Sequence, residues 1–481
     1  MNGSIYTWSS INSYFASYLH YNGNEKITTT DTFFLMPCIF LFQYFFMSPG
    51  VKLGDRITVR GSTIVAVVLM VGSYLFLILS TNFYLILLGF CLFGLGDGLG
   101  NLSVIKNCWL YFPNNKALVN GIILGAYGLN SAILNPLADF VFINPKKKKT
   151  DDDGYYPPEV ANNLLNFLYF IMIMFGVMGT FAILLTIPYE KDLDEKVNDV
   201  DVINHSEINF KKSLLNKEKT VGVNENFNGT RDSTINTYSN INSSLTSEDK
   251  SSKSRSSYHI NNFWTGFFSV PNLQLGIICF SVPFFLYLLT NTNRAFGNLA
   301  DISQSALQIM AILFGVVNGT TRFMWGLIMD KFSFKPLMLI IMILESSIAF
   351  SVYFSKINEY LYIFENLMCA ICLSGFFVTI TPTFNKVFGF DNGAKLYGLT
   401  GITIGVASFL GPILTKIYIG DKNEKDLYRN VYFLGGFIVV LSLISLFMFE
   451  EKSFEYDTNV KIDEIKNENI VTVTDEKKEI K

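Results

Sequence analysis

The sequence predicts an all-α membrane protein made of two bundles of six helices each. Three observations support this fold class. Of the 481 residues, 50% are hydrophobic and only 16% are charged, whereas soluble domains carry about 25% charged residues. Apolar runs long enough to cross a bilayer recur along the chain. Two sequence landmarks also repeat at almost the same offset, which indicates that one half is a duplicate of the other.

About eleven apolar runs of roughly 20 residues predict membrane-spanning helices. They cover residues 31–50, 61–80, 84–106, 117–141, 162–187, 271–293, 303–328, 336–355, 361–385, 396–419 and 428–449. The first twenty residues are helical in composition, but they are too short and too polar at their start for a full span. They also lack the basic leader and apolar centre of a secretory signal.

Polar segments divide the chain into four parts. Residues 1–188 are the expected N-terminal bundle and residues 263–449 the expected C-terminal bundle. Between them, residues 189–262 are rich in Asn, Ser, Lys and Glu with few large apolar residues, which predicts a disordered linker. The charged stretch 450–481 is predicted to be a tail.

Two internal repeats support the duplication. "VKLGDRITVR" and "GLIMDKFSFK" each follow a predicted span, and their aspartates, Asp55 and Asp330, lie 275 positions apart. "GAYGLNSAILNP" and "GITIGVASFLGP" end in Pro136 and Pro412, which lie 276 positions apart. Two unrelated landmarks with nearly one offset predict parallel halves related by a pseudo-two-fold axis along the membrane normal.

Basic residues in the short loops predict which side faces the cytoplasm. Six spans separate the two aspartate loops, so both loops lie on one side. The short loops of that side carry Lys52, Arg56, Arg60, Lys106, Lys116, Lys331, Lys335, Lys386 and Lys395. The loops of the opposite side carry fewer Lys and Arg residues, except for the lysine run 146–149. We therefore expect the aspartate loops, both termini and the linker to lie in the cytoplasm. The plasma membrane and an organelle membrane both fit this topology.

Cysteines and histidines predict no catalytic or metal centre. All six cysteines lie in apolar runs, and Cys369 and Cys372 share C-x-x-C spacing within a predicted helix. We expect them to pack as small hydrophobic side chains. The three histidines lie at a helix end and in the linker, so we expect no metal site, no cofactor and no enzyme activity. The net charge of −3 gives no indication of a nucleic-acid partner, and none is expected.

Several motifs resemble the major facilitator superfamily. D-R-x-x-x-R at 55–60 and D-K-x-x-x-K at 330–335 resemble its cytoplasmic signature. More narrowly, "IYTW" at 5–8, "WLYFPNNKALVNGIILGAYGLNSA" at 109–132 and "NGTTRFMWGLIMDKF" at 318–332 are similar to the oxalate/formate antiporters and their monocarboxylate-transporter relatives. The resemblance covers nearly the whole chain except the linker and tail. It implies twelve helices, cytoplasmic termini and a central cavity open to one side at a time.

The resemblance also implies an incomplete first helix. In the family, the I-Y-x-W stretch lies midway along this helix, but here only four residues precede it. Because about twenty apolar residues are needed to cross a bilayer, we expect the missing half of the span to lie upstream of Met1.

Arg322 is the expected substrate-binding residue. It lies near the end of the run 303–328, two helical turns before Asp330 and about 12 Å deeper. A charge at mid-membrane costs about 2.5–3.5 kcal/mol on insertion scales, so such residues usually face a cavity or a partner. The resemblance implies that this arginine binds substrate, and a guanidinium can donate two parallel hydrogen bonds to a carboxylate. Alternatively, the side chain snorkels to the headgroups or pairs with a fixed acid.

The run 396–419 departs from the antiporter pattern. "LYGLTGITIG" has Thr400 where that pattern has a lysine, and Lys395 is a weaker candidate for the second cation. With one cation at mid-membrane, a dicarboxylate would keep an uncompensated charge in a low dielectric. We therefore expect a singly charged anion, such as pyruvate, lactate, formate or pantothenate.

Gln43, Asn318 and Tyr6 are further candidates for the substrate site. Gln43 and Asn318 each lie twelve residues before their motif aspartates, which predicts equivalent depths in the two halves. Asn318 is also one turn before Arg322 on the same helix face. Both amides could bind substrate or join helices. Tyr6 resembles a cavity aromatic of the family, with core packing as the alternative.

Asp97 is the one acid deep in the N-terminal half. It lies in "FGLGDGLGN", whose glycines form two G-x-x-x-G pairs that allow close helix packing. The monocarboxylate relatives place an acid four residues before the arginine, where this chain has Asn318. Asp97 could replace that acid and carry a proton with the anion, or it could pair with Arg322 or a polar helix face. Glu345 and Glu365 are weaker candidates.

The motif residues Asp55, Arg56, Asp330 and Lys331, which we call the motif latch, are expected to control conformation rather than contact substrate. Charges at helix ends can pair with neighbouring helix ends in one state and separate in another.

We therefore predict a monomeric secondary transporter of a small monocarboxylate anion that works by alternating access, with proton symport or anion exchange. Its partners would be the anion, protons and the lipid bilayer. Two alternatives are a transporter of uncharged solutes or drugs, in which Arg322 is locked to Asp97, and a membrane sensor that binds solute but moves none.

Overall fold

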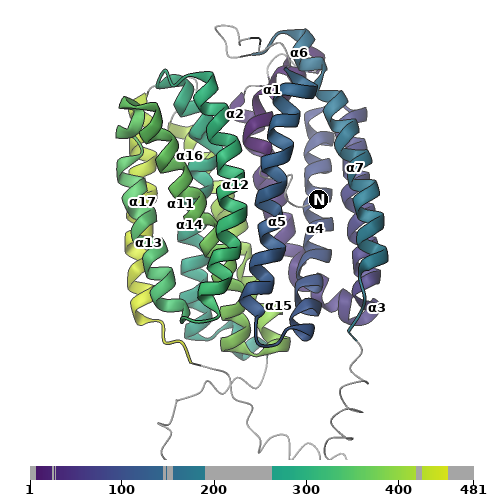
Figure 1. Cartoon of the computed structure of the whole chain (residues 1–481), viewed down its shortest axis with the longest axis vertical. Helices are drawn as coiled ribbons and strands as arrows, with labels where there is room; N and C mark the ends of the chain where they lie inside the picture. Colours follow the sequence, from purple (N-terminus) through teal and green to yellow (C-terminus); the bar gives the residue numbers. More distant parts are fainter. Residues whose placement is uncertain are drawn as a thin grey trace, which may run out of the picture. The chain divides into compact units, whose positions relative to one another are not determined.

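The computed structural model of the chain describes residues 7–23, 27, 29–144, 148, 155–189, 263–418 and 425–452. All regular elements in these residues are helices (Figure 1). Residues 1–188 and 257–481 belong to one compact unit. The predicted linker beyond Tyr189 and the predicted tail beyond Lys452 lie outside the described residues.

The helices fall into two sets, one from each half of the chain. The first half contains α1 (Trp8–Asn22), α2 (Thr29–Thr32), α3 (Leu35–Leu79), α4 (Phe83–Tyr111), α5 (Lys116–Pro136), the π-helix η2 (Leu137–Ile143), α6 (Pro158–Asn162) and α7 (Leu164–Leu185). The second half contains α10 (Phe263–Phe267), α11 (Val270–Leu299), α12 (Gln304–Met329), α13 (Phe334–Ser351), the 3₁₀-helix η3 (Phe354–Ile357), α14 (Glu359–Phe388), α15 (Phe390–Thr400), α16 (Ile402–Tyr418) and α17 (Lys425–Met448). Ten helical segments of the described residues are long and apolar enough to cross a membrane.

The predicted spans 31–50 and 61–80 are joined rather than separated by a loop. Helix α3 runs through both, and only Ile57 and Thr58 have non-helical backbone angles. Thr58 has φ of 71°, a region that β-branched residues rarely occupy. Its hydroxyl accepts a hydrogen bond from the Gly61 backbone N–H at 3.3 Å, so it caps the second segment. Two helices therefore meet at this joint, in agreement with the two predicted spans, and together they form α3.

Local signals explain where several other helices begin and end. Asn and Ser side chains accept backbone N–H bonds at four helix starts, as expected for N-caps: Asn82 from Tyr84, Ser269 from Asn272, Ser303 from Ala306 and Asn358 from Tyr360. Gly389, with φ of 79°, ends α14 and lets α15 begin at the next residue. The predicted helix 396–419 therefore begins earlier than expected and is divided into α15 and α16 at Gly401.

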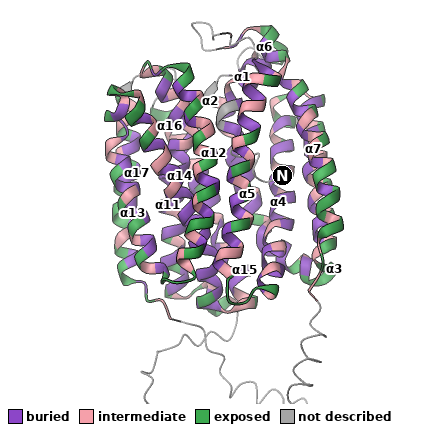
Figure 2. Ribbon diagram, in the orientation of Figure 1, coloured by how far each residue is buried: buried purple, intermediate pink, exposed green. Residues whose placement is uncertain are grey.

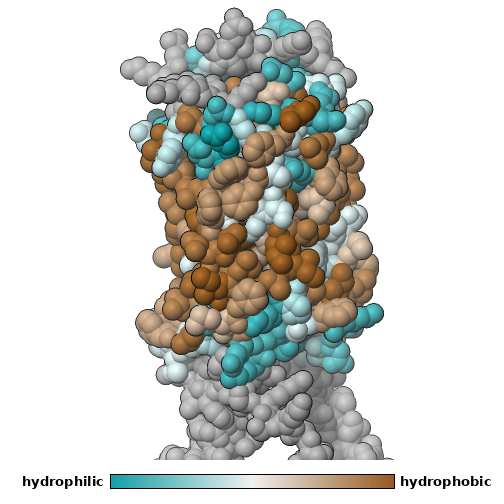
Figure 3. All heavy atoms as spheres, turned by 90° about the vertical axis from the view of Figure 1, so that its left-hand side faces the viewer, coloured by the Kyte–Doolittle hydropathy of each residue, from teal (hydrophilic) through white to brown (hydrophobic). Residues whose placement is uncertain are grey.

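Large apolar side chains cover the outer surface of the helices. On α17, Phe437, Leu441 and Ile444 are each 58–65% exposed. Figure 2 shows exposed residues along the outer helices α7, α13 and α17, and Figure 3 shows an apolar middle zone between hydrophilic ends on one face. A contiguous apolar surface of this kind suits contact with lipid. The chain is a multi-pass integral membrane protein.

The most extensive contacts between the two halves are made by two equivalent pairs of helices. Helix α5 packs on α12, and α3 packs on α16. Glycines allow the backbones to approach: a Cβ atom on Gly128 would lie 2.4 Å from the backbone nitrogen of Gly319, and one on Gly405 would lie 2.8 Å from the Cα of Leu41. Each pair joins one helix of the first half to one of the second. This arrangement agrees with the predicted pseudo-two-fold relation and leaves space between the halves.

Helix α4 is held between the two segments of α3 by the glycines that flank Asp97. A Cβ atom on Gly94 would lie 2.3 Å from the Ile39 carbonyl oxygen, in the first segment. A Cβ atom on Gly100 would lie 2.6 Å from the Cβ of Ala66, in the second segment. The close helix packing predicted from the G-x-x-x-G pairs is present, and it fixes the position of Asp97.

Candidate functional site

A cavity lies between the two halves. Helices α3, α4 and α5 form one wall, and α11, α12, α14 and α15 form the other. Six of its lining residues are aromatic: Phe40, Tyr44, Tyr127, Tyr287, Phe377 and Tyr397. Its polar lining includes Gln43, Asn101, Asn120 and Thr381. Among the described residues that line it, Arg322 is the one cation and Asp97 the one acid.

Arg322 projects from α12 into the wall of this cavity. It is 1% exposed, so its guanidinium does not snorkel to the headgroups. Its Nε donates a hydrogen bond to Asn318 Oδ1 at 3.2 Å, and its Nη1 donates one to the Leu124 carbonyl at 2.8 Å. The guanidinium carbon lies 5.7 Å from the centre of the Phe377 ring, within the range of a cation–π contact. Neutral groups from three helices therefore orient the cation.

Asp97 lines the same cavity from α4. It is 1% exposed. Asn101 lies one helical turn further along α4, on the same face, and its Oδ1 accepts a hydrogen bond from the Tyr127 hydroxyl at 3.0 Å. A carboxyl group, an amide and a phenol therefore adjoin one another on the first-half side of the cavity.

Asp330 ties the two halves at the end of the helices where the motif loops lie. Its carboxylate oxygens accept the backbone N–H groups of Ala117 and Leu118 at 3.1 and 3.0 Å. These two residues form the first turn of α5 in the other half. An anion at a helix N-terminus is stabilised by the unpaired N–H groups and by the helix dipole.

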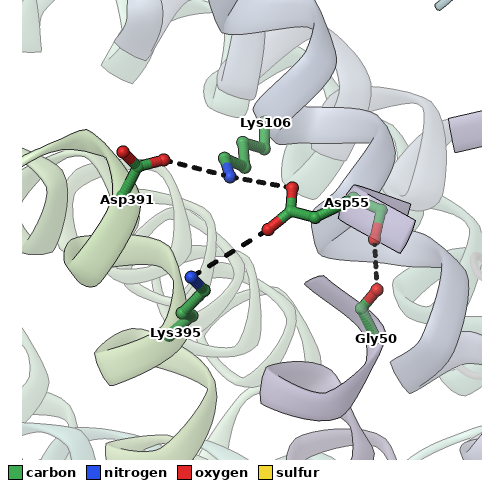
Figure 4. A network of polar contacts seen from close by, with 6 residues as sticks. Gly50, Asp55, Lys106, Asp391 and Lys395 are labelled. Atoms are coloured by element: carbon green, nitrogen blue, oxygen red, sulfur yellow. Dashed lines mark hydrogen bonds and ion pairs between the residues drawn. The ribbon is translucent and has the colours of Figure 1, made fainter. Parts of the chain in front are cut away.

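Asp55 makes the corresponding contact from the first half. Lys106 Nζ lies 3.1 Å from Asp55 and 3.4 Å from Asp391, and Figure 4 shows this lysine between the two carboxylates. Lys395 Nζ lies 4.0 Å from Asp55. Asp391 and Lys395 belong to α15, in the second half. Because the Asp55 side chain is 46% exposed, each pair contributes about 0–1 kcal/mol.

Charged residues also join the halves at the opposite end. Lys416 of α16 lies 2.6 Å from Asp31 of α2. Asp139 of η2 and Arg294 of α11 interact electrostatically. Contacts between the halves are therefore present at both ends of the central cavity.

Comparison with known proteins identifies the fold. Residues 273–468 match the model of the Major Facilitator Superfamily. The solved structure of the proton:xylose symporter XylE, bound to 6-bromo-6-deoxy-D-glucose, superposes with a TM-score of 0.57, covering 94% of this chain and 95% of that one at 13% identity. The chain has the major facilitator superfamily fold. The structure of the human organic anion transporter MFSD10 (TETRAN) is similar to this chain with a TM-score of 0.55 at 11% identity, covering 92% of this chain and 96% of that one.

A curated relative of this chain is the Escherichia coli (strain K12) protein YhjX, an uncharacterized MFS-type transporter. The two are 29% identical over 130 residues, which cover 27% of this chain and 31% of YhjX. The matched part is thus less than a third of that protein's length. The superfamily consists of transporters rather than enzymes, in agreement with the expectation that this chain is not an enzyme.

The major facilitator fold brings together some of the predicted site residues. Gln43, Asp97 and Arg322 line one cavity. Asn318 is fully buried behind Arg322 and is not among the residues that line the cavity. Its Oδ1 accepts a hydrogen bond from the Arg322 Nε–H. Tyr6 lies outside the described residues. Of the motif latch, Asp55 and Asp330 contact the opposite half, and Arg56 and Lys331 are exposed in the same loops.

Thr400, which occupies the position of a lysine in the antiporter pattern, is not among the described residues that line the cavity. The hydroxyl of Thr400 donates to Asn272 Oδ1 at 2.8 Å, between α15 and α11. Lys395, the weaker candidate for a second cation, instead lies 4.0 Å from Asp55 at the motif end. Neither residue is among the described residues that line the cavity.

The sequence analysis did not single out several polar residues of the site. Asn120 donates to the Phe377 and Val378 carbonyls at 3.3 Å and so joins α5 to α14. Asn101 was detectable, because it lies one turn after Asp97 within an apolar run. Arg294 was missed because the predicted helix ended at residue 293, whereas α11 continues to Leu299.

The Asp330 contact gives a prediction about the motif end of this protein. Replacing Asp330 by Asn should weaken its contact with the N-terminus of α5 by about 1 kcal/mol. Because this contact joins the two halves, the fraction of molecules in which the central cavity is open at the motif end should rise roughly fivefold. Met47 lines the central cavity, so labelling of a Met47→Cys variant by a water-soluble maleimide should become faster.

Glu359→Gln is the matched control, because Glu359 accepts the Ser303 backbone N–H at 2.8 Å within the second half. Equal labelling rates in the Asp330 and Glu359 variants would show that the Asp330 contact does not hold the motif end closed.

Proposed function

We propose that this chain is a secondary active transporter that moves a small monocarboxylate anion by alternating access. The observation that carries the proposal is the position of Arg322, buried in the wall of a cavity between the halves. The hydrogen bonds that its Nε and Nη1 donate to Asn318 and Leu124 hold the guanidinium in this position. A planar guanidinium suits a carboxylate because it can donate two parallel hydrogen bonds.

The charges in the cavity favour an anion with a single charge. Among the described lining residues, one cation faces one acid. A bound monocarboxylate would balance Arg322 when Asp97 carries a proton, whereas a dicarboxylate would leave a charge uncompensated in a low dielectric. This balance favours symport of the anion with a proton on Asp97. Anion exchange is the second mode of the same proposal, in which one anion replaces another at Arg322.

The remaining lining suits a small organic acid. The cavity walls are largely aromatic and carry a few polar groups, a combination that is usual in small-molecule sites. The six aromatic side chains offer apolar contact for a short carbon chain, and Gln43 offers an amide near the carboxylate. The resemblance of the motif around Arg322 to the oxalate/formate and monocarboxylate transporters leads to the same substrate class.

Flux measurements on the purified full chain in proteoliposomes test this function. Formate, pyruvate, lactate, pantothenate and oxalate would be compared, each with and without an inward proton gradient. We expect uptake of at least one monocarboxylate, stimulated by the gradient, and little uptake of oxalate. Transport of uncharged solutes alone, or binding without flux in every condition, would instead favour the two alternative functions.

A further inference from the structure

A second cavity of about 280 Å³ lies within the first half, among α3, α4, α5 and α7. Its residues run from near the motif end of these helices to their middle. Ala182 lies three residues before the end of α7, and Val104 lies seven residues before the end of α4. Asp97, midway along α4, lines the inner part. The cavity therefore extends from close to the motif end up to the buried carboxyl group.

Asp97, Asn101 and Tyr127 line both this second cavity and the central cavity. The hydrogen bond of 3.0 Å between Tyr127 and Asn101 joins α5 to α4 within this partition. Gly96 and Gly100 form part of the α4 face that lines the second cavity. Because glycine has no side chain, neither residue covers the carboxyl group of Asp97. Only a single layer of polar side chains therefore separates the two cavities.

The second cavity does not cross the contacts that tie the halves at the motif end. Its lining residues all belong to the first half. The contacts of Asp330 with α5 and of Lys106 with Asp391 instead join the two halves. A proton can therefore reach Asp97 from the motif end through the second cavity while these contacts are intact. A solute that enters the central cavity from the same end requires the contacts to break.

We propose that Asp97 exchanges its proton with the motif end through the second cavity, while the anion enters and leaves through the central cavity. This inference rests on the proposed transport function. A hydronium ion in the second cavity transfers its proton to the Asp97 carboxylate, which leaves water and a neutral carboxyl group, and the reverse step releases the proton. A proton is small enough for this route, and the carboxylate anion remains at Arg322.

The groups around Asp97 are compatible with this role. From α7, the residues facing the second cavity are Met178 and Ala182, which do not titrate. The second segment of α3 contributes Thr63, Ala66, Val67 and Met70, which also do not titrate. The titratable or charged residues that share either cavity with Asp97 are Tyr44, Tyr127, Tyr287, Arg322 and Tyr397. Asp97 is therefore the one carboxyl group among the described lining residues of both cavities.

Filling the second cavity tests the proposal. Val104 lines this cavity but not the central one, so Val104→Phe should obstruct the proton route and leave the anion site intact. We expect uptake driven by a proton gradient to fall at least fivefold. Counterflow exchange, which needs no net proton movement, should stay within twofold of wild type. Both assays use the most rapidly exchanged acid among formate, pyruvate, lactate and pantothenate.

Val68→Phe is the matched control, because Val68 is 64% exposed and lines neither cavity. Ile123→Phe, from the α5 wall of the same cavity, gives a second test if the Val104 variant does not fold. Equal loss of both activities, or loss of neither, would overturn the proton route while wild-type exchange upholds the transport function. An inactive wild type would instead overturn the transport function itself.

Discussion

Replacing Arg322 by lysine should reduce uptake of the transported monocarboxylate at least tenfold without unfolding the protein. Lysine keeps the charge but lacks the planar fork that can donate two parallel bonds to a carboxylate. Loss of one hydrogen bond to a charged group costs about 1.5–3 kcal/mol, which corresponds to a roughly ten- to hundredfold loss of binding. Uptake by proteoliposomes and substrate binding by the purified variant would both be measured.

Arg429→Lys provides the control for this substitution. The Arg429 guanidinium lies 5.6 Å from the ring of Tyr353 and does not line the central cavity, so anion uptake should stay close to wild type. A normal uptake rate in the Arg322 variant would refute the role of Arg322 as the anion-binding residue.

Gly128→Val should disrupt the contact between α5 and α12 and abolish most transport. A Cβ atom at this position would lie 2.4 Å from the Gly319 backbone nitrogen and 2.7 Å from its Cα. Backbone atoms cannot move aside as a flexible side chain can, so the helices must separate. Overpacking of this kind typically costs about 1–3 kcal/mol. We expect a lower thermal unfolding midpoint in detergent together with greatly reduced uptake.

Gly176→Val is the matched control, since a Cβ atom on Gly176 would meet nothing within 4 Å. Both substitutions place the same β-branched residue in a helix, so the propensity effect is shared. If the two variants unfolded at the same temperature and transported equally well, close packing of α5 on α12 would not be needed for the transport cycle.

The helices and the relation between the halves were largely predictable from the sequence, because apolar length and repeated motifs are local signals. The joint in α3 was not. Both spans are present, but the polar residues between them suggested a longer loop, whereas only Ile57 and Thr58 leave the helical conformation and the Thr58 hydroxyl caps the second segment. The predicted helix 396–419 was likewise too short at its start, since Gly389 lets α15 begin directly after α14.

The candidate site was predictable only in part. Charged residues in apolar runs indicated Arg322 and Asp97, because few other reasons keep a charge at that depth. The sequence could not predict that Asn318 packs behind Arg322, since two residues on one helix face can differ in which of them reaches a cavity. The second cavity could not be predicted, because residues from four different helices line it and no single sequence segment carries a signal for it.

The joint at Thr58 has a mechanical consequence. Before it, α3 contributes Phe40, Gln43, Tyr44 and Met47 to the central cavity. After it, the same helix contributes Thr63, Ala66, Val67 and Met70 to the second cavity. Only two non-helical residues connect the two segments of α3, and each segment lines one of the two cavities. If the halves rock as the proposed alternating access requires, tilting of the first segment should also move the second, so we expect the two cavities to change shape together.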